Sequence, residues 1–185
     1  MAKGLIVVAH PDDDAIFAGA FQIAHPWLNW SVVSVTYDKN HERALEMKNW
    51  QDQLGVSDLI HLGFPDDPGD LQRQESSFSA KQVARELVRL PQDYDIVLTH
   101  NYLGEYGHPH HKTTAEAMAI SKYDNIYTFG HNLDSYDLLC EVTPFREDIL
   151  RCFPSQKSLI MLFHSDILNC CHKSSYRRLR PQELV

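Results

Sequence analysis

The chain has 185 residues, a length that fits one domain and can bury a substantial core. Its formal net charge of -8 argues against nucleic acid as the main partner, because phosphate binding needs a basic face. No stretch reaches the roughly 20 apolar residues of a membrane span. The 4 cysteines form no CxxC pair, and reduced thiols are the default for cysteines without such a pattern. We therefore expect a cytoplasmic protein with no membrane span.

Apolar patterns that alternate between strand and helix spacing follow one another along the chain. In order, they predict a strand over 4–9, a helix over 13–24, a strand over 30–37, a helix over 41–54 that Gly55 ends, a strand over 58–62, a helix over 79–90, a strand over 95–99 and a helix over 111–122. Beyond residue 125 the pattern predicts strands over 126–129 and 158–163 and a short helix over 144–152.

Strands that alternate with helices are typical of a parallel sheet with helices on both faces. We therefore predict a three-layer αβα fold with a mostly parallel, Rossmann-like sheet, in a single domain over 1–185. One segment, 63–79, is long and polar and has no core pattern. Loops of this length are often functional, and a solvated loop is the alternative.

Two dense polar clusters follow predicted strands. Residues 10–14 (H-P-D-D-D) come directly after the first strand, and residues 106–111 (Y-G-H-P-H-H) come after the fourth strand and a short loop. Ligands in open α/β sheets bind at the edge where the carboxyl ends of the parallel strands meet. We therefore expect the two clusters to lie together at that edge.

The residue types in the two clusters suit metal-assisted hydrolysis. A solvated acidic turn and a polar loop with chance histidines are the alternatives. Together, however, the clusters offer two imidazoles and a carboxylate, and a catalytic zinc takes three protein ligands of this kind while it keeps a position open for water. A neighbouring carboxylate that does not bind the metal can take the proton from that water.

The same residues resemble a known family. A-H-P-D-D-D at 9–14 resembles the A-H-P-D-D-E signature of the LmbE/PIG-L deacetylases, and G-H-P-H-H at 107–111 resembles their second motif, G-H-P-D-H. Arg43 and Glu46 resemble the R-x-x-E helix of the family, and L-G-F-P-D at 62–66 resembles its L-G-x-x-D turn. Lys157 and His164 weakly resemble a C-terminal K…H-S element, so the resemblance covers most of the chain.

The resemblance implies a zinc-dependent hydrolase that removes an N-acetyl group from a small-molecule amino sugar or glycoconjugate. It implies these Zn²⁺ ligands: His10, Asp13 and His111. It implies Asp12 as the general base for the attacking water. A protonated His108 and Tyr106 would stabilise the oxyanion.

Further residues are implied on the substrate side of the site. Arg43 and Asp66 match family positions that hold sugar hydroxyls. His100, at the end of the fourth strand, and His164 are further candidates to face the site. The sequence indicates no oligomeric state.

Two departures from the family motifs keep other functions open. Asp14 stands where the family has Glu, and His110 stands where it has Asp. The loss of that Glu leaves open a glycan-binding module that holds the metal without turnover. A third reading takes His10, Asp12 and His111 as the facial triad of an iron(II) oxygenase, but in such oxygenases the H-x-D pair lies in an all-β jelly roll.

Overall fold

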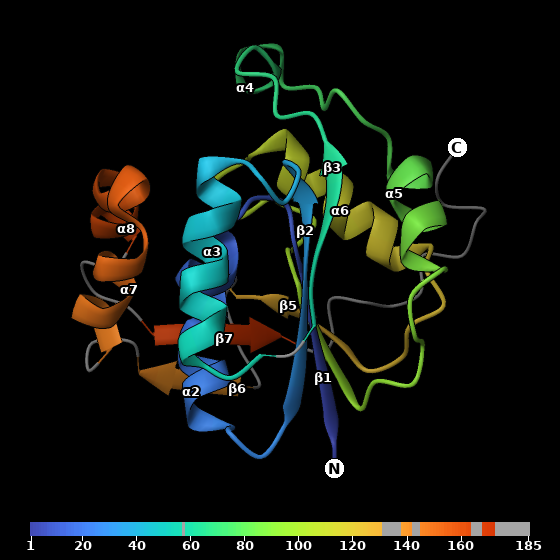
Figure 1. Cartoon of the computed structure of the whole chain (residues 1–185). Coiled ribbons are helices and arrows are strands. Elements are labelled where there is room, and N and C mark those ends of the chain that lie inside the picture. The colour runs from blue at the N-terminus through green and yellow to red at the C-terminus, as the bar shows by residue number, and fades with distance from the viewer. Residues whose placement is uncertain (57, 131–137, 142–144, 164–167, 173–185) are drawn as a thin grey trace.

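The computed structural model describes residues 1–56, 58–130, 138–141, 145–163 and 168–172 (Figure 1). Among them, seven strands form one sheet in the order β3-β2-β1-β4-β5-β7-β6. Their bounds are β1 (Lys3–Val8), β2 (Asn29–Thr36), β3 (Asp58–Phe64), β4 (Ile96–Thr99), β5 (Ile126–Phe129), β6 (Leu138–Glu141) and β7 (Leu168–His172). β1 to β5 pair in parallel, whereas β7 pairs antiparallel with β5 and β6.

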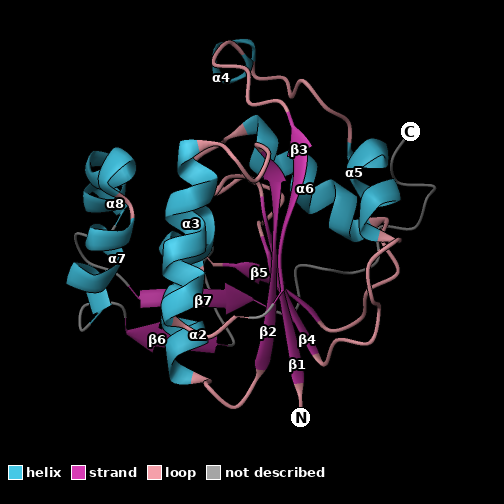
Figure 2. Cartoon of the chain, in the orientation of Figure 1, coloured by secondary structure: helices cyan, strands magenta, loops and turns pink. Residues whose placement is uncertain are grey.

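Helices cover both faces of the sheet (Figure 2). One face carries α1 (Asp13–Phe17), α2 (Gly19–Ala24), α3 (Glu42–Gln53), α7 (Arg146–Cys152) and α8 (Lys157–Phe163). The other carries α5 (Ala80–Leu87) and α6 (Pro109–Ala119), and the short α4 (Asp70–Arg73) lies beyond the end of β3. The predicted αβα fold with a mostly parallel sheet is confirmed.

The apolar strands build a separate core on each face, because successive side chains of a strand point to opposite sides. Ile6 and Val8 of β1 lie in the core with α1, α2 and α3. Leu5 and Val7 lie in the core with α5 and α6. All four are fully buried, and each such aliphatic side chain contributes about 1.5–3 kcal/mol on burial. This rigid β1 is the support on which the first polar cluster stands.

The predicted elements differ from the observed ones in a few places. The helix expected over 13–24 is divided into α1 and α2 at Ala18, whose φ of -128° leaves the helical range. The strand expected over 158–163 is wrong, because Lys157–Phe163 is the helix α8. A short apolar run fits a strand or a helix equally well, and the buried Ile160 next to the exposed Met161 shows one-sided burial.

The far end of the sheet was not predicted. The pattern gave no strand at β6 or β7, and His164 lies outside the described residues. In the described part of the chain, no helix combines the length and the apolar character needed to cross a bilayer.

Candidate active site

The structure brings the two polar clusters together at the carboxyl edge of the sheet. β1 and β4 are hydrogen-bonded neighbours, so the segments that follow them leave the sheet side by side. After β1 the chain turns at once, with the backbone N–H groups of Asp12 and Asp13 donating to the His10 carbonyl at 2.9 and 3.2 Å. After β4 a loop leads to α6, where Pro109 takes the first helical turn and His108 caps it.

Three buried side chains, those of His10, Asp13 and His111, bring together three atoms that can each give a lone pair to a metal ion. We call these three atoms the donor triangle. His10 Nδ1 lies 3.1 Å from Asp13 Oδ2, His111 Nε2 lies 3.4 Å from the same oxygen, and the two nitrogens are 3.3 Å apart. Ligand atoms of a tetrahedral zinc, each about 2.0–2.1 Å from the ion, are about 3.3–3.4 Å apart. The donor set and its spacing therefore fit a zinc ion, and these are the three residues that the resemblance implies as ligands.

Glu105 holds His111 in the tautomer that a metal ligand needs. Its Oε2 accepts from His111 Nδ1 at 2.6 Å and from His100 Nδ1 at 2.9 Å, and its Oε1 accepts from the Asn101 backbone at 2.9 Å. Burial favours the neutral acid, but His100 and His111 outweigh it and lower the pKa of Glu105 to about 2. When His111 is neutral with its hydrogen on Nδ1, the lone pair of Nε2 is directed at Asp13 and His10.

Sequence reasoning missed Glu105. The residue has a φ of 54°, in the left-handed region that non-glycine residues rarely adopt. Such strain persists where surrounding contacts fix the residue. The only signal in the sequence is a carboxylate six positions before His111, which no general spacing rule singles out.

His100 lies beneath the triangle but is not one of its donors. Its Nε2 is 3.3 Å from Asp13 Oδ2, yet the same nitrogen accepts the backbone N–H of Ala9 at 2.9 Å. Because Nδ1 donates to Glu105, this hydrogen bond uses the lone pair that a metal would need. His100 also stacks on His111, with ring centroids 3.8 Å apart, and so supports the position of that ring.

His108 and Tyr106 stand at the outer side of the histidines. His108 Nδ1 accepts the His110 backbone N–H at 3.2 Å, so the hydrogen of the neutral ring is on Nε2. Burial, together with His10 and His111, lowers the pKa of His108 to about 2, which favours this singly protonated form over the imidazolium. The Tyr106 ring is 5.7 Å from that of His108 and remains 40% exposed. Burial raises the pKa of Tyr106, which keeps its hydroxyl a donor.

Asp12 lies next to the triangle without belonging to it. Its Oδ1 accepts from Arg43 Nη2 at 2.9 Å, and its buried Oδ2 has no hydrogen-bond partner among the described residues. Burial raises the pKa of Asp12 to about 6, although Arg43 opposes the shift. The other guanidinium nitrogen, Arg43 Nη1, is 3.4 Å from Asp66 Oδ2 and 3.2 Å from the Tyr37 hydroxyl.

Residues 5–121 match the sequence profile of PIG-L, described as GlcNAc-PI de-N-acetylase. The chain belongs to the PIG-L family. The family resemblance of the two motifs is thereby confirmed. A curated relative, the uncharacterized protein L374 of Acanthamoeba polyphaga mimivirus, is 29% identical over 146 residues. This match covers 71% of the chain and 63% of the relative, so the chain spans less than two thirds of that protein's length.

Solved structures show where else this fold occurs. The N,N'-diacetylchitobiose deacetylase from Pyrococcus horikoshii is 18% identical with a TM-score of 0.61, and the match covers 89% of this chain and 70% of that chain. GalB, the 4-carboxy-2-hydroxymuconate hydratase from Pseudomonas putida KT2440, is 17% identical with a TM-score of 0.58, covering 88% and 83%. At these identities the likeness establishes the fold alone, and the two proteins are named for different reactions, a deacetylation and a hydration.

The Asp that replaces the usual Glu of the PIG-L signature points into helix packing. Asp14 is fully buried, and its Oδ2 accepts from Gln51 on α3. Burial raises the pKa of Asp14 to about 7. Glu46, from the R-x-x-E helix, accepts from the backbone N–H of Ser155 at 2.9 Å. Both acids therefore make contacts that tie α3 to its neighbours.

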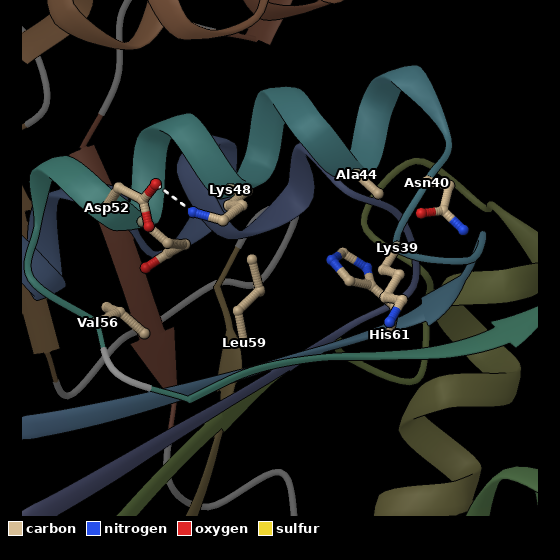
Figure 3. A pocket seen from close by; sticks show the side chains of 9 residues that line it. Lys39, Asn40, Ala44, Lys48, Asp52, Val56, Leu59 and His61 are labelled. Atoms are coloured by element: carbon tan, nitrogen blue, oxygen red, sulfur yellow. Dashed lines mark hydrogen bonds and ion pairs between the residues drawn. The ribbon is translucent and has the colours of Figure 1, made fainter.

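A cavity of about 360 Å³ lies between α3 and β3 (Figure 3). Its polar lining includes Lys39, Lys48 and His61, and Lys48 is paired with Asp52 on the same helix. None of its lining residues belongs to the cluster of His10, Asp13 and His111. The cavity is thus separate from the triangle of His10, Asp13 and His111.

Proposed function

We propose that this chain is a zinc-dependent N-deacetylase that hydrolyses the N-acetyl group of an amino sugar or a glycoconjugate. The observation that carries the proposal is the buried triangle of His10, Asp13 and His111, with donor atoms 3.1–3.4 Å apart and Asp12 beside it. Membership of the PIG-L family and the fold shared with a chitobiose deacetylase support the same reaction class.

The geometry favours Asp13 over Asp12 as the third donor. Asp12 is engaged by Arg43 at 2.9 Å, whereas Asp13 faces both histidines. This arrangement argues against the iron(II) triad of His10, Asp12 and His111, as does the parallel α/β sheet in place of a jelly roll.

When bound, zinc would supply a Lewis acid and would lower the pKa of water to about 7. The free Oδ2 of Asp12 is the base that takes the proton of the attacking water. Its pKa of about 6 suits a base that works near neutral pH. Arg43 holds the other oxygen of this carboxylate and so sets the direction in which Oδ2 points.

Two hydrogen-bond donors stabilise the negative charge that develops on the oxygen of the acetyl group. His108 offers Nε2–H and Tyr106 its hydroxyl, and one such donor is often worth about 3–4 kcal/mol. The water oxygen bonds to the acetyl carbon, the C–N bond breaks, and the departing amine receives the proton held by Asp12. The products are acetate and a free amino sugar.

Arg43 and Asp66 form the substrate side of the proposed site. Their mutual contact of 3.4 Å and the bond of 2.5 Å from the Tyr37 hydroxyl to Asp66 place charged and polar groups beside Asp12. Both side chains keep some exposure, so sugar hydroxyls can replace these mutual hydrogen bonds. This is the part of the site that we expect to recognise the sugar.

A panel of N-acetylated amino sugars tests the proposal. The zinc-loaded protein is incubated with each sugar, and primary-amine and acetate release are measured with and without a chelator. We expect amine and acetate in equal amounts, lost with chelator and restored by zinc. Zinc binding without release from any sugar would favour the glycan-binding alternative, and chelator-resistant release would contradict the metal mechanism.

A further inference from the structure

A second row of buried groups continues outward from the donor triangle. His10 Nε2, the ring nitrogen on the side away from the triangle, is 3.0 Å from His110 Nδ1. His110 Nε2 is in turn 2.7 Å from Asp70 Oδ2. The three side chains come from the turn after β1, the first turn of α6 and the start of α4, and all are buried.

Asp70 is held as an acceptor at the outer end of this row. Its Oδ2 also accepts the Ser77 backbone N–H at 2.6 Å, and its Oδ1 accepts from Arg73 at 2.5 Å. Burial favours the protonated acid, but the hydrogen bonds from His110 and Ser77 outweigh it and keep the pKa of Asp70 below its ordinary value. A carboxylate with these partners needs a hydrogen on His110 Nε2.

When His110 is neutral, the direction of every hydrogen bond in the row follows from that first one. Neutral His110 with its hydrogen on Nε2 has a bare Nδ1, which can only accept. His10 must therefore donate to it from Nε2. The remaining ring nitrogen, His10 Nδ1, is then bare and lies in the donor triangle, 3.1 Å from Asp13 Oδ2 and 3.3 Å from His111 Nε2.

We propose that Asp70 and His110 are positioning residues, and that the Asp70–His110–His10 row fixes the tautomer and orientation of His10 as a metal ligand. Metal-bound histidines usually donate their other N–H to a neighbouring acceptor, and such partners commonly contribute about 10- to 100-fold in metal affinity. His110 stands where the second PIG-L motif has Asp, so in this chain an imidazole accepts from His10 and Asp70 supplies the carboxylate one step further out. The inference rests on the proposed role of His10.

This row also gives the long polar segment 63–79 a function. Asp70 is 1% exposed, and Phe78 packs on the His110 ring at a centroid distance of 4.9 Å. A merely solvated loop would not place a carboxylate and an aromatic ring on one histidine. The segment therefore acts as the outer support of the metal site.

A competing arrangement uses the same atoms as ligands of a second cation. His10 Nε2, Asp66 Oδ1 and His110 Nδ1 lie 3.0, 3.4 and 3.8 Å apart. Binding there would require His10 to lose both ring hydrogens, since Nδ1 already faces the first triangle. The row of hydrogen bonds needs no such loss, and metal stoichiometry separates the two arrangements.

Zinc affinity, measured on metal-free protein by competition with a chromophoric chelator, tests the role of His110. We expect His110→Leu to lower the affinity by about 10- to 100-fold, because His10 loses its acceptor. His110→Asn should regain most of it, since an amide oxygen can accept from His10 Nε2. A structural role alone would not be rescued by this substitution.

Asp70→Asn tests the outer end of the row against a matched control. We expect it to weaken zinc binding, whereas Asp67→Asn, which removes the other carboxylate partner of Arg73, should leave binding unchanged. NMR of isotope-labelled histidines in the wild-type protein should show both His10 and His110 with the hydrogen on Nε2. Asp70→Asn should shift the His110 signals.

Three results would overturn the proposal. These are zinc affinity in His110→Leu equal to that of wild type, a wild-type His110 with its hydrogen on Nδ1, or a second equivalent of zinc that His110→Asn loses. The NMR result decides even where a variant does not fold. Since none of these measurements uses turnover, failure of the deacetylase assay leaves them interpretable, and their failure leaves that assay valid.

Discussion

The donor triangle and the substrate side of the site lie next to each other but are built differently. His111 and Asp13 have side-chain exposures of 0% and 3%, and the outer ring atoms of His10 and His111 are held by His110 and Glu105. Arg43 and Asp66, at 16% and 18%, instead share hydrogen bonds with each other and with Tyr37.

Buried polar atoms without a hydrogen-bond partner also distinguish the substrate side from the donor triangle. Asp12 Oδ2 and Arg43 Nε are buried, and neither has a hydrogen-bond partner among the described residues. Unpaired buried polar atoms are costly, and they are rarely kept unless a ligand or water completes them. The triangle is thus suited to hold one geometry, whereas the Asp12–Arg43–Asp66 side is suited to exchange partners when substrate binds.

Asp12→Asn is expected to separate zinc binding from catalysis by the largest factor. It removes the base but no triangle donor, so we expect zinc content to stay at the wild-type level while kcat falls by about 10²- to 10⁴-fold. His111→Ala, the control, should lose zinc and activity together. Metal analysis beside amine release measures both. Turnover in Asp12→Asn at the wild-type rate would remove Asp12 from the base role.

Tyr106→Phe tests a donor at the boundary of the two regions. The ring is retained and the hydroxyl lost, so we expect kcat to fall by about 10²- to 10³-fold with little change in KM, because the donor acts on charge that develops only in the transition state. Steady-state kinetics on the best substrate of the panel measure this. A rise in KM alone would instead assign Tyr106 to substrate binding.

Glu105→Gln is expected to weaken zinc binding by the donor triangle, because Glu105 bonds the ring nitrogen of His111 that lies outside the triangle. When the amide oxygen keeps the bond from the Asn101 backbone, the NH2 group faces His100 and His111 and can accept from neither, so the His111 tautomer is no longer fixed. We expect zinc affinity to fall by about 10- to 100-fold, with activity recovered at high zinc. Chelator competition measures the affinity. Unchanged affinity would show that His111 needs no anchor.

The sequence predicted the parallel part of the fold because its strands are short apolar runs separated by helical patterns. The pattern predicts neither β6 nor β7, and it predicts a strand where the structure has α8, since a short apolar run such as 158–163 carries no period that distinguishes a strand from a helix. The motif residues His10, Asp13 and His111 could be named because strand ends and family motifs both point to them. How they meet follows from the pairing of β1 with β4.

The supporting residues could not be predicted in the same way. Glu105 and Asp70 act through hydrogen bonds that depend on a left-handed φ of 54° and on the course of a loop, and neither leaves a period or a spacing in the sequence. His110 was visible as a departure from the motif. Its partner Asp70 reaches it because the segment 63–79 packs against the start of α6, and no pattern in the sequence indicates that packing.

The smallest effect is expected from Asp66→Asn on the exchangeable side. The amide keeps the size of the side chain but weakens its acceptance from Tyr37 and Arg43, and in our proposal from a sugar hydroxyl. Loss of one such hydrogen bond is worth about 0.5–1.5 kcal/mol, so KM should rise about two- to tenfold while kcat and zinc content stay close to wild type. A matching loss of zinc would instead place Asp66 among the metal ligands, and the division between a fixed triangle and an exchangeable substrate side would fail.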